Sequence, residues 1–408
     1  MNWKGKIIII IHLIILSGCL KDAVPEIKEY PVIKILKPTH IDSSGITLNA
    51  EYINHGSEKT IAFGFVWDTE KPDILNSDTT IISYQPEIKT YSIRLRDGFI
   101  KGYAYKVQAF AYTENNVVYS NTIDFKSLGS QYCPWQQLLN YNFRGIYYSF
   151  GYGYGMSNNK CGYILFSHMG DFYELNMIDN IIIKKQNFPN SNRQSFGLVA
   201  TLNIDNNLYF ICAKSKIFWQ YSNDAWHNLG QRPDFNFSSG IIGFSVNGKG
   251  YFGTGSELYE YNEETGFWIS KKPIPTSKVY SSAIINEGVY VIGANKEVFK
   301  SDSILDNWSY VSDYPGILEG QLIGFSLKEK AYFGLNYASG FVVNRFIWEY
   351  DPKKNSWNRL CIFPRYKLYQ SNITLFTIDG KAYFGVPLSD FGSFQLFEFN
   401  PDKLIQKN

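Results

Sequence analysis

Residues 248–268, GKGYFGTGSELYEYNEETGFW, hold two short strand-like runs separated by a glycine-rich break and followed by a polar turn. Aromatic residues lie in both runs, and those of the second run, Tyr259 and Tyr261, alternate as is typical of half-buried antiparallel strands. The stretch either binds a ligand through its glycines or is one copy of a repeated structural unit. The surrounding sequence decides between these alternatives.

A tyrosine in a short apolar run recurs along the chain beyond residue 129. The six tyrosines are Tyr163, Tyr209, Tyr251, Tyr290, Tyr332 and Tyr383, separated by 46, 42, 39, 42 and 51 residues. Such a period indicates a propeller or a solenoid array. The overall composition agrees, because 17% of the residues are aromatic and aromatic side chains favour strands.

Each copy continues with a third strand and, in most copies, a fourth. The fourth strand opens with tryptophan in four copies: Trp226, Trp268, Trp308 and Trp357. In the first copy an isoleucine run at 181–183 takes this place, and the last copy ends before a fourth strand. A strand beginning at Trp135 precedes the first copy. We therefore predict a closed six-bladed β-propeller over residues 131–408 whose N-terminal strand completes the final blade, leaving no open edge.

The repeats resemble kelch repeats, most clearly at residues 243–275. Kelch repeats usually carry a glycine pair after the second strand, whereas single glycines such as Gly253 and Gly293 stand there in this chain. The resemblance implies a kelch-type propeller. Gly253 and Gly255 are then expected to permit the strand exit and a close backbone approach, so the opening stretch is a structural repeat.

Some kelch propellers are enzymes, and the resemblance raises two possibilities. Copper radical oxidases of this family need two tyrosine and two histidine ligands and a Tyr–Cys cross-link. The propeller holds only His168, between strands of the first copy, and His227, on a fourth strand, so the two histidines are not expected to meet. We therefore predict no metal, no cofactor and no catalytic residues. The alternative is a sugar-active enzyme, since kelch-like proteins that isomerise sialic acid need only polar groups around the channel.

Binding is the preferred hypothesis, and it points to one face of the propeller. Loops from each fourth strand to the next first strand share this face with loops joining second to third strands. The candidate ligand-binding residues there are Arg144, Arg193, Arg232, Phe235, Lys278, Tyr280, Arg365 and Tyr366. Cationic donors beside aromatic faces suit a glycan or protein ligand. The alternative is that they are ordinary solvated loop residues.

Residues 31–128 predict a separate all-β domain. Six strand-like runs divided by polar turns fit an immunoglobulin-like sandwich of about 100 residues, and they lie at 32–36, 45–53, 61–67, 91–96, 103–112 and 117–125. Residues 99–125 resemble the end of a fibronectin type III domain, with Phe99 before the turn and Tyr105 in the strand. The resemblance implies that Tyr105 returns its hydroxyl to the backbone and that the domain is a spacer. Trp67 is expected in its core.

The first 18 residues predict a lipoprotein signal peptide. Lys4 and Lys6 precede an apolar run from Ile7 to Leu16, which is too short to cross a bilayer. The residues Leu-Ser-Gly-Cys that end it resemble the bacterial lipobox, which implies lipidation of Cys19. The alternative is an ordinary secretory signal with an accidental cysteine.

Residues 19–30 are polar and read as a tether, so we expect a protein anchored by lipid in the outer membrane, facing the periplasm or the surface. Without Lys4 and Lys6 the chain carries 37 basic and 37 acidic residues, which argues against nucleic acid. Cys133, Cys161, Cys212 and Cys361 show no metal-binding spacing, and buried thiols are favoured over disulfides.

Overall fold

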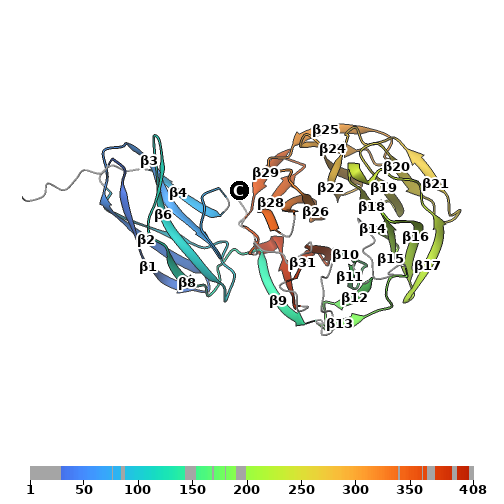
Figure 1. The fold of residues 1–408 in the computed structure, drawn as a ribbon, viewed down its shortest axis with the longest axis horizontal. Helices are drawn as coiled ribbons and strands as arrows, with labels where there is room; N and C mark the ends of the chain where they lie inside the picture. The colour runs from blue at the N-terminus through green and yellow to red at the C-terminus, as the bar shows by residue number, and fades with distance from the viewer. Residues whose placement is uncertain are drawn as a thin grey trace, which may run out of the picture.

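The computed structural model describes residues 29–75, 77–83, 88–142, 153–167, 170–179, 181–189, 199–338, 341–360, 362–364, 373–387 and 393–403. These residues form an all-β protein with two short 3-10 helices. The described residues contain no helix that is both long enough and apolar enough to cross a membrane. Figure 1 shows a two-sheet region beside a ring of smaller sheets.

The N-terminal two-sheet region spans residues 29–128. One sheet has the order β1-β2-β5, and the other has the order β4-β3-β6-β7, with β8 also pairing with β6. The strands are β1 (Val32–Asp42), β2 (Gly45–Asn54), β3 (Thr60–Asp68), β4 (Asp78–Ser83), β5 (Thr90–Leu95), β6 (Ala104–Thr113), β7 (Val117–Tyr119) and β8 (Ile123–Lys126). Both sheets contribute to one buried cluster, so they pack face to face.

Two details of this region match the sequence prediction and two differ. Trp67 is buried in the core, and the Tyr105 hydroxyl accepts a hydrogen bond from Ile100 N at 3.0 Å. The run predicted as one last strand is two strands, β7 and β8, because the chain leaves β6 at Ser120, whose hydroxyl accepts from Ala109 N. The strand β4 was not predicted, since DTTIIS lacks aromatic residues and strict alternation.

Six four-stranded antiparallel sheets make up the ring (Figure 1). The first three are β10 (Gly153–Ser157), β11 (Gly162–Phe166), β12 (Asp171–Asn176) and β13 (Ile181–Lys184); β14 (Val199–Ile204), β15 (Asn207–Cys212), β16 (Ser215–Ser222) and β17 (Ala225–Gln231); β18 (Ile242–Val246), β19 (Lys249–Gly253), β20 (Leu258–Tyr261) and β21 (Trp268–Lys271). All six repeated tyrosines lie in second strands and are buried.

The other three sheets continue the ring and close it. They are β22 (Val279–Ile285), β23 (Gly288–Gly293), β24 (Glu297–Ser301) and β25 (Trp308–Asp313); β26 (Gln321–Leu327), β27 (Lys330–Ala338), β28 (Phe341–Asp351) and β29 (Ser356–Arg359); β30 (Thr374–Ile378), β31 (Lys381–Pro387), β32 (Ser393–Phe399) and β9 (Trp135–Asn142). As predicted, β9 pairs antiparallel with β32 and supplies the fourth strand of the last sheet.

The ring is held together between its sheets. Among the described residues, six hydrophobic clusters lie in the ring, and each fills a boundary between two neighbouring sheets. Trp135, for example, packs at 5.0 Å against Phe363, Phe384 and Phe399. A second recurring contact joins second and third strands: Tyr251 donates to Glu260 at 3.0 Å, and Lys249 pairs with the same carboxylate.

The two-sheet region packs directly on the ring. Ile100 and Cys133 belong to the cluster that fills the boundary between the last two sheets. Asp68, at the end of β3, pairs with Arg345 of β28, and both side chains are buried. Asp78 accepts from Ile362 N at 3.3 Å, and burial raises its pKa to about 7. The expected spacer is therefore docked on the ring through a charged, buried junction.

Candidate ligand-binding site

A cavity of about 480 Å3 opens at the axis of the ring. The inner strands of all six sheets line it, near the end at which these strands begin. This is the face to which the fourth-to-first connections lead. The lining includes Gly155, Thr201, Gly243, Ser282, Gly324 and Leu375, one residue from each inner strand. We call this opening the channel mouth.

Lys278 and Tyr280 supply the charge and the aromatic surface of the channel mouth. Lys278 directly precedes β22 and Tyr280 lies within it, with the Lys278 Nζ 4.6 Å from the centre of the tyrosine ring. Tyr154, Phe237 and Gln321 line the same cavity. The described lining contains one ammonium group, several hydroxyls, one side-chain amide and no carboxylate. Such a site can hold an anionic group and stack an apolar sugar face on an aromatic ring.

The backbone of Lys278 is fixed by the glycine-rich stretch with which the sequence analysis began. A Cβ at Gly255 would lie 2.5 Å from Ser277 C and 2.6 Å from Lys278 N, so only glycine lets the two backbones approach this closely. The hydroxyl of Thr276 donates to Lys278 O at 3.1 Å. The close backbone approach expected at Gly255 is thus confirmed, and it makes Gly255 a positioning residue for the channel mouth.

Arg232 and Phe235 do not belong to the accessible lining, which corrects the sequence-based expectation. The Arg232 guanidinium is buried and donates to three backbone carbonyls, those of Cys212, Ser215 and Pro233. Burial lowers its pKa from the usual value. Phe235 is buried too, with its ring 5.5 Å from that of Tyr259. Both residues stabilise the loop that carries Phe237.

Five of the predicted functional residues lie outside the described residues. They are Cys19, Arg144, Arg193, Arg365 and Tyr366. The structure therefore brings together Lys278 and Tyr280, adds Tyr154, Phe237, Gln321 and Gly255, and removes Arg232 and Phe235 from the candidate set.

A second cavity, of about 430 Å3, lies where the inner strands end. Asparagine and serine dominate its lining, but these side chains stabilise the turns around it. Asn203 Nδ2 donates to Ser157 O at 2.6 Å, and Asn158 Oδ1 accepts from Lys160 N and Cys161 N. Because these amides are already engaged within the protein, this end of the ring is a weaker candidate than the channel mouth.

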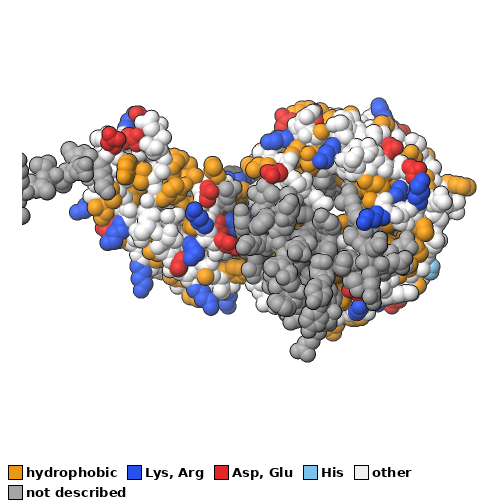
Figure 2. Space-filling view, in the orientation of Figure 1, with side chains coloured by type: hydrophobic (Ala, Val, Ile, Leu, Met, Phe, Trp, Pro, Cys, Tyr) orange, Lys and Arg blue, Asp and Glu red, His pale blue; other side chains and the backbone are white. Residues whose placement is uncertain are grey.

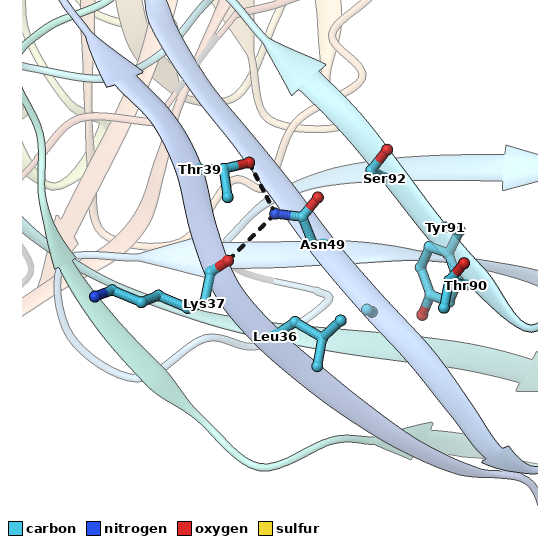
Figure 3. Close-up of a pocket in the computed structure, with 8 residues that line it drawn as sticks. Leu36, Lys37, Thr39, Asn49, Thr90, Tyr91 and Ser92 are labelled. Atoms are coloured by element: carbon cyan, nitrogen blue, oxygen red, sulfur yellow. Dashed lines mark hydrogen bonds between the residues drawn. The ribbon is translucent and has the colours of Figure 1, made fainter.

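A third hollow, of about 360 Å3, lies on the sheet β1-β2-β5 (Figure 3). The amide of Asn49 donates to Lys37 O at 3.2 Å and to Thr39 Oγ1 at 3.1 Å, and the figure shows these bonds bridging the irregularity in β1. The hollow follows from this bulge and from small neighbours such as Ser92. We assign it no ligand.

The described histidines, cysteines and carboxylates form no group of three that could hold a metal ion. His227 is exposed on β17, and His168 lies outside the described residues. Cys133 and Cys212 are buried free thiols, while Cys161 is half-buried and free. Burial raises the pKa of Cys133 to about 12. A thiol with a raised pKa is a poor nucleophile at neutral pH.

The fold and the channel mouth define an all-β protein whose ring of six four-stranded antiparallel sheets is propeller-like. No family model matches the sequence, and no curated protein matches it. Among solved structures, one described as "Structure of YjhT" is similar, with 13% sequence identity and a TM-score of 0.48. The match covers 62% of this chain and 94% of that one. A likeness at this level carries no argument for a shared ligand or activity.

Proposed function

We propose that this protein is a lipid-anchored binding protein of the cell envelope that recognises a glycan or protein ligand at the channel mouth. Its ring is of the kelch type, as supported by the buried second-strand tyrosines and the tryptophans that open the fourth strands. Its two-sheet region is a fibronectin type III or immunoglobulin-like domain. The sheet order β1-β2-β5 facing β4-β3-β6 and the returned hydroxyl of Tyr105 support that assignment.

The observation that carries the binding proposal is the pairing of Lys278 and Tyr280 at a cavity on the axis. An ammonium group beside an aromatic face matches an acidic sugar, whose carboxylate and apolar ring face would be held together. The described lining offers no competing carboxylate, so an anion entering the mouth meets only attraction from the side chains there.

Arg144, Arg193, Arg365 and Tyr366 extend this proposal from sequence alone. Each lies in a connection between a fourth strand and the next first strand, and the flanking first strands begin at the channel mouth. We propose that these residues add donors and an aromatic face around the ligand. Phosphate or carboxylate groups would be their partners.

A glycan array probed with the Cys19→Ser chain, which lacks the lipid, tests the proposal. We expect binding to acidic glycans, weakened roughly tenfold or more by Lys278→Ala because a charge-assisted contact is lost. Glu264→Ala is the matched control, since Glu264 is exposed in the turn after β20. Glu263 is unsuitable as a control, because its carboxylate accepts from the buried Tyr209 across two sheets. Equal binding by the Lys278 and Glu264 variants would place the site elsewhere.

The second candidate function is a sugar-active enzyme, such as one that isomerises sialic acid. The phenols of Tyr154 and Tyr280 and the amide of Gln321 at one cavity favour it, because these groups can hold sugar hydroxyls during proton transfer. Proton NMR of sialic acid anomers with and without the protein separates the two functions. Faster anomer exchange indicates an enzyme, whereas line broadening at an unchanged rate indicates binding.

Anchoring through Cys19 has its own test. Metabolic labelling with a fatty-acid analogue should mark the wild-type chain, and Cys19→Ser should abolish both the label and membrane association. A label that persists in the variant would refute lipidation at this residue.

A further inference from the structure

The described chain begins at one end of the two-sheet region, where it is fixed to neighbouring turns. Glu29 O accepts from Ser57 N at 3.1 Å and from Glu58 N at 2.7 Å. The Glu58 carboxylate in turn accepts from the Asn115 amide at 2.8 Å, which brings in the β6–β7 hairpin. We call this end, formed by residues 29–31, 53–61 and 113–117, the N-terminal pole.

Large apolar side chains are exposed at the N-terminal pole. Tyr30 is 48% exposed, Ile53 60%, Ile61 56% and Val117 37%. Each lies within five residues, along the chain, of the hydrogen-bonded contacts at Glu29, Glu58 or Asn115, so all four residues belong to the N-terminal pole. Figure 2 shows hydrophobic side chains on the part of the two-sheet region away from the ring, over β3 and β4 of Figure 1. Exposed apolar groups that gather at one place indicate a contact surface.

The pole lies opposite the junction with the ring. The junction involves Asp68 at the end of β3, whereas the pole contains Thr60 at the start of the same strand. A nine-residue strand rises about 30 Å, which separates the pole from the ring by roughly the length of the region. Figure 1 shows the ring at the other end of the two-sheet region.

We propose that the N-terminal pole rests on the lipid surface that holds the anchor, with Tyr30, Ile53, Ile61 and Val117 in contact with the membrane interface. This inference rests on the proposed lipidation of Cys19. Glu29 lies ten positions after Cys19, a length that spans at most about 35 Å when extended. The bilayer is therefore within reach of the pole, and tyrosine with aliphatic neighbours is suited to the interface between headgroups and acyl chains.

The charges at the pole define the kind of lipid surface. Glu29, Glu58 and Glu114 outnumber Lys59, whose ammonium group pairs with Glu114 at 3.6 Å. Hydrogen bonds from Thr113, Asn115 and Asn116 lower the pKa of Glu58, which keeps it charged. An acidic excess gives no attraction to anionic lipid. The contact is accordingly apolar, and it should form on a zwitterionic surface and resist salt.

The contact has a structural consequence for the proposed binding site. A pole that touches the membrane orients the two-sheet region away from the surface, and the buried junction of Asp68 with Arg345 passes that orientation to the ring. The channel mouth is then held at a fixed height rather than at the end of a freely turning tether. This explains why an anchored binding protein would need a docked first region instead of a flexible linker.

Spin labelling of the full lipidated chain in phosphatidylcholine vesicles tests the proposal. Single cysteines replace Ile53 or, as a matched control on the ring, Ile269, which is 44% exposed on β21. The background carries Cys161→Ser and Cys361→Ser, because Cys161 is half-buried and Cys361 lies outside the described residues, whereas Cys133 and Cys212 are buried. A second pole position, Ile61→Cys, serves if Ile53→Cys fails to fold.

We expect the label at residue 53 to become several-fold more accessible to oxygen than to a water-soluble nickel chelate once vesicles are added, at low and high salt alike. The label at residue 269 should stay aqueous. Equal aqueous accessibility at both positions in protein that sediments with vesicles overturns the membrane contact and leaves lipidation intact. Protection of residue 53 from both reagents indicates a protein partner and overturns it too. Protein that does not sediment refutes the anchor itself.

Discussion

The two parts of this protein keep their strands together in different ways. The two-sheet region has one core, to which both of its sheets contribute. The ring has six smaller cores, each between neighbouring sheets, so that every sheet is stabilised on both faces by its neighbours. A destabilising substitution in the two-sheet region therefore affects one core. A substitution that separates two neighbouring sheets of the ring leaves both sheets with exposed faces and edges.

The largest expected effect is at the point of ring closure. Trp135 lies on β9, the strand that completes the last sheet, and its buried indole packs against three phenylalanines from other segments. Trp135→Ala removes these contacts. We expect a loss of about 3–5 kcal/mol in the free energy of unfolding. Trp308→Ala is the control, since that side chain is only half-buried at the outer edge, and it should cost clearly less. Equal losses in chemical denaturation would contradict a special role for closure.

The junction between the two parts should give the next largest effect. Arg345→Ala leaves Asp68 and Asp78 buried without their cation, at a cost of about 3–5 kcal/mol. We expect calorimetry to show two separate transitions in place of one, because the two-sheet region loses its charged contact with the ring. Arg359→Ala in the same sheet removes only a stacking contact with Phe346, and should cost about 0.5–1 kcal/mol and leave a single transition.

A pH dependence should come from the same junction. The pKa of Asp78 is raised to about 7 by burial, against an ordinary value of 3.8, while Arg345 lowers it and Asp68 and Asp97 raise it further. The folded protein thus holds a proton that the unfolded chain releases near pH 4. The stability this proton contributes is complete below pH 4 and is lost as the pH rises through 7.

Asp78→Asn should remove that pH dependence. We expect the variant to lose less stability than the wild type between pH 5 and 8 in urea titrations, and to be the more stable of the two at pH 8. Asp42→Asn is the control, because Asp42 is exposed and the Ser44 hydrogen bonds lower its pKa to about 2, outside this pH range. Parallel pH profiles for the wild type and Asp78→Asn would show that Asp78 is already ionised.

The smallest effect concerns the contact repeated within the sheets. Glu260→Ala removes the acceptor of the buried Tyr251 hydroxyl and the partner of Lys249, and should cost about 1–2 kcal/mol. The exposed Glu264→Ala should change the unfolding free energy by less than about 0.5 kcal/mol. Equal unfolding free energies for the two variants would mean that water replaces the Glu260 carboxylate without loss of stability.

The same contrast explains what the sequence could predict. The ring was predictable because each sheet repeats the same buried tyrosine at a regular spacing, and a missing fourth strand at one end matched an extra strand at Trp135. In the two-sheet region no repeat exists, and β4 was missed because its segment looks polar on its own. Its core partners come from other strands, so burial there depends on tertiary packing.

The candidate site was predictable only in part, for a physical reason. Topology places Lys278 and Tyr280 on the face that holds the channel mouth, since the direction of each strand fixes which connections share an end. It does not reveal that the guanidinium of Arg232 turns inward to backbone carbonyls as far as 20 residues away. The junction was equally hidden, because Asp68 and Arg345 are 277 residues apart and belong to no motif.

The buried thiols of Cys133 and Cys212 have a consequence for biogenesis. Both are unpaired in the folded protein, and burial raises the pKa of each thiol, so little of the reactive thiolate exists once folding is complete. In the oxidising compartment proposed for this protein, the unfolded chain has no such protection. The yield of native protein would then depend on relative rates, because the segment before β9 and the end of β15 must be covered by their neighbours before an oxidant reaches the sulfur atoms.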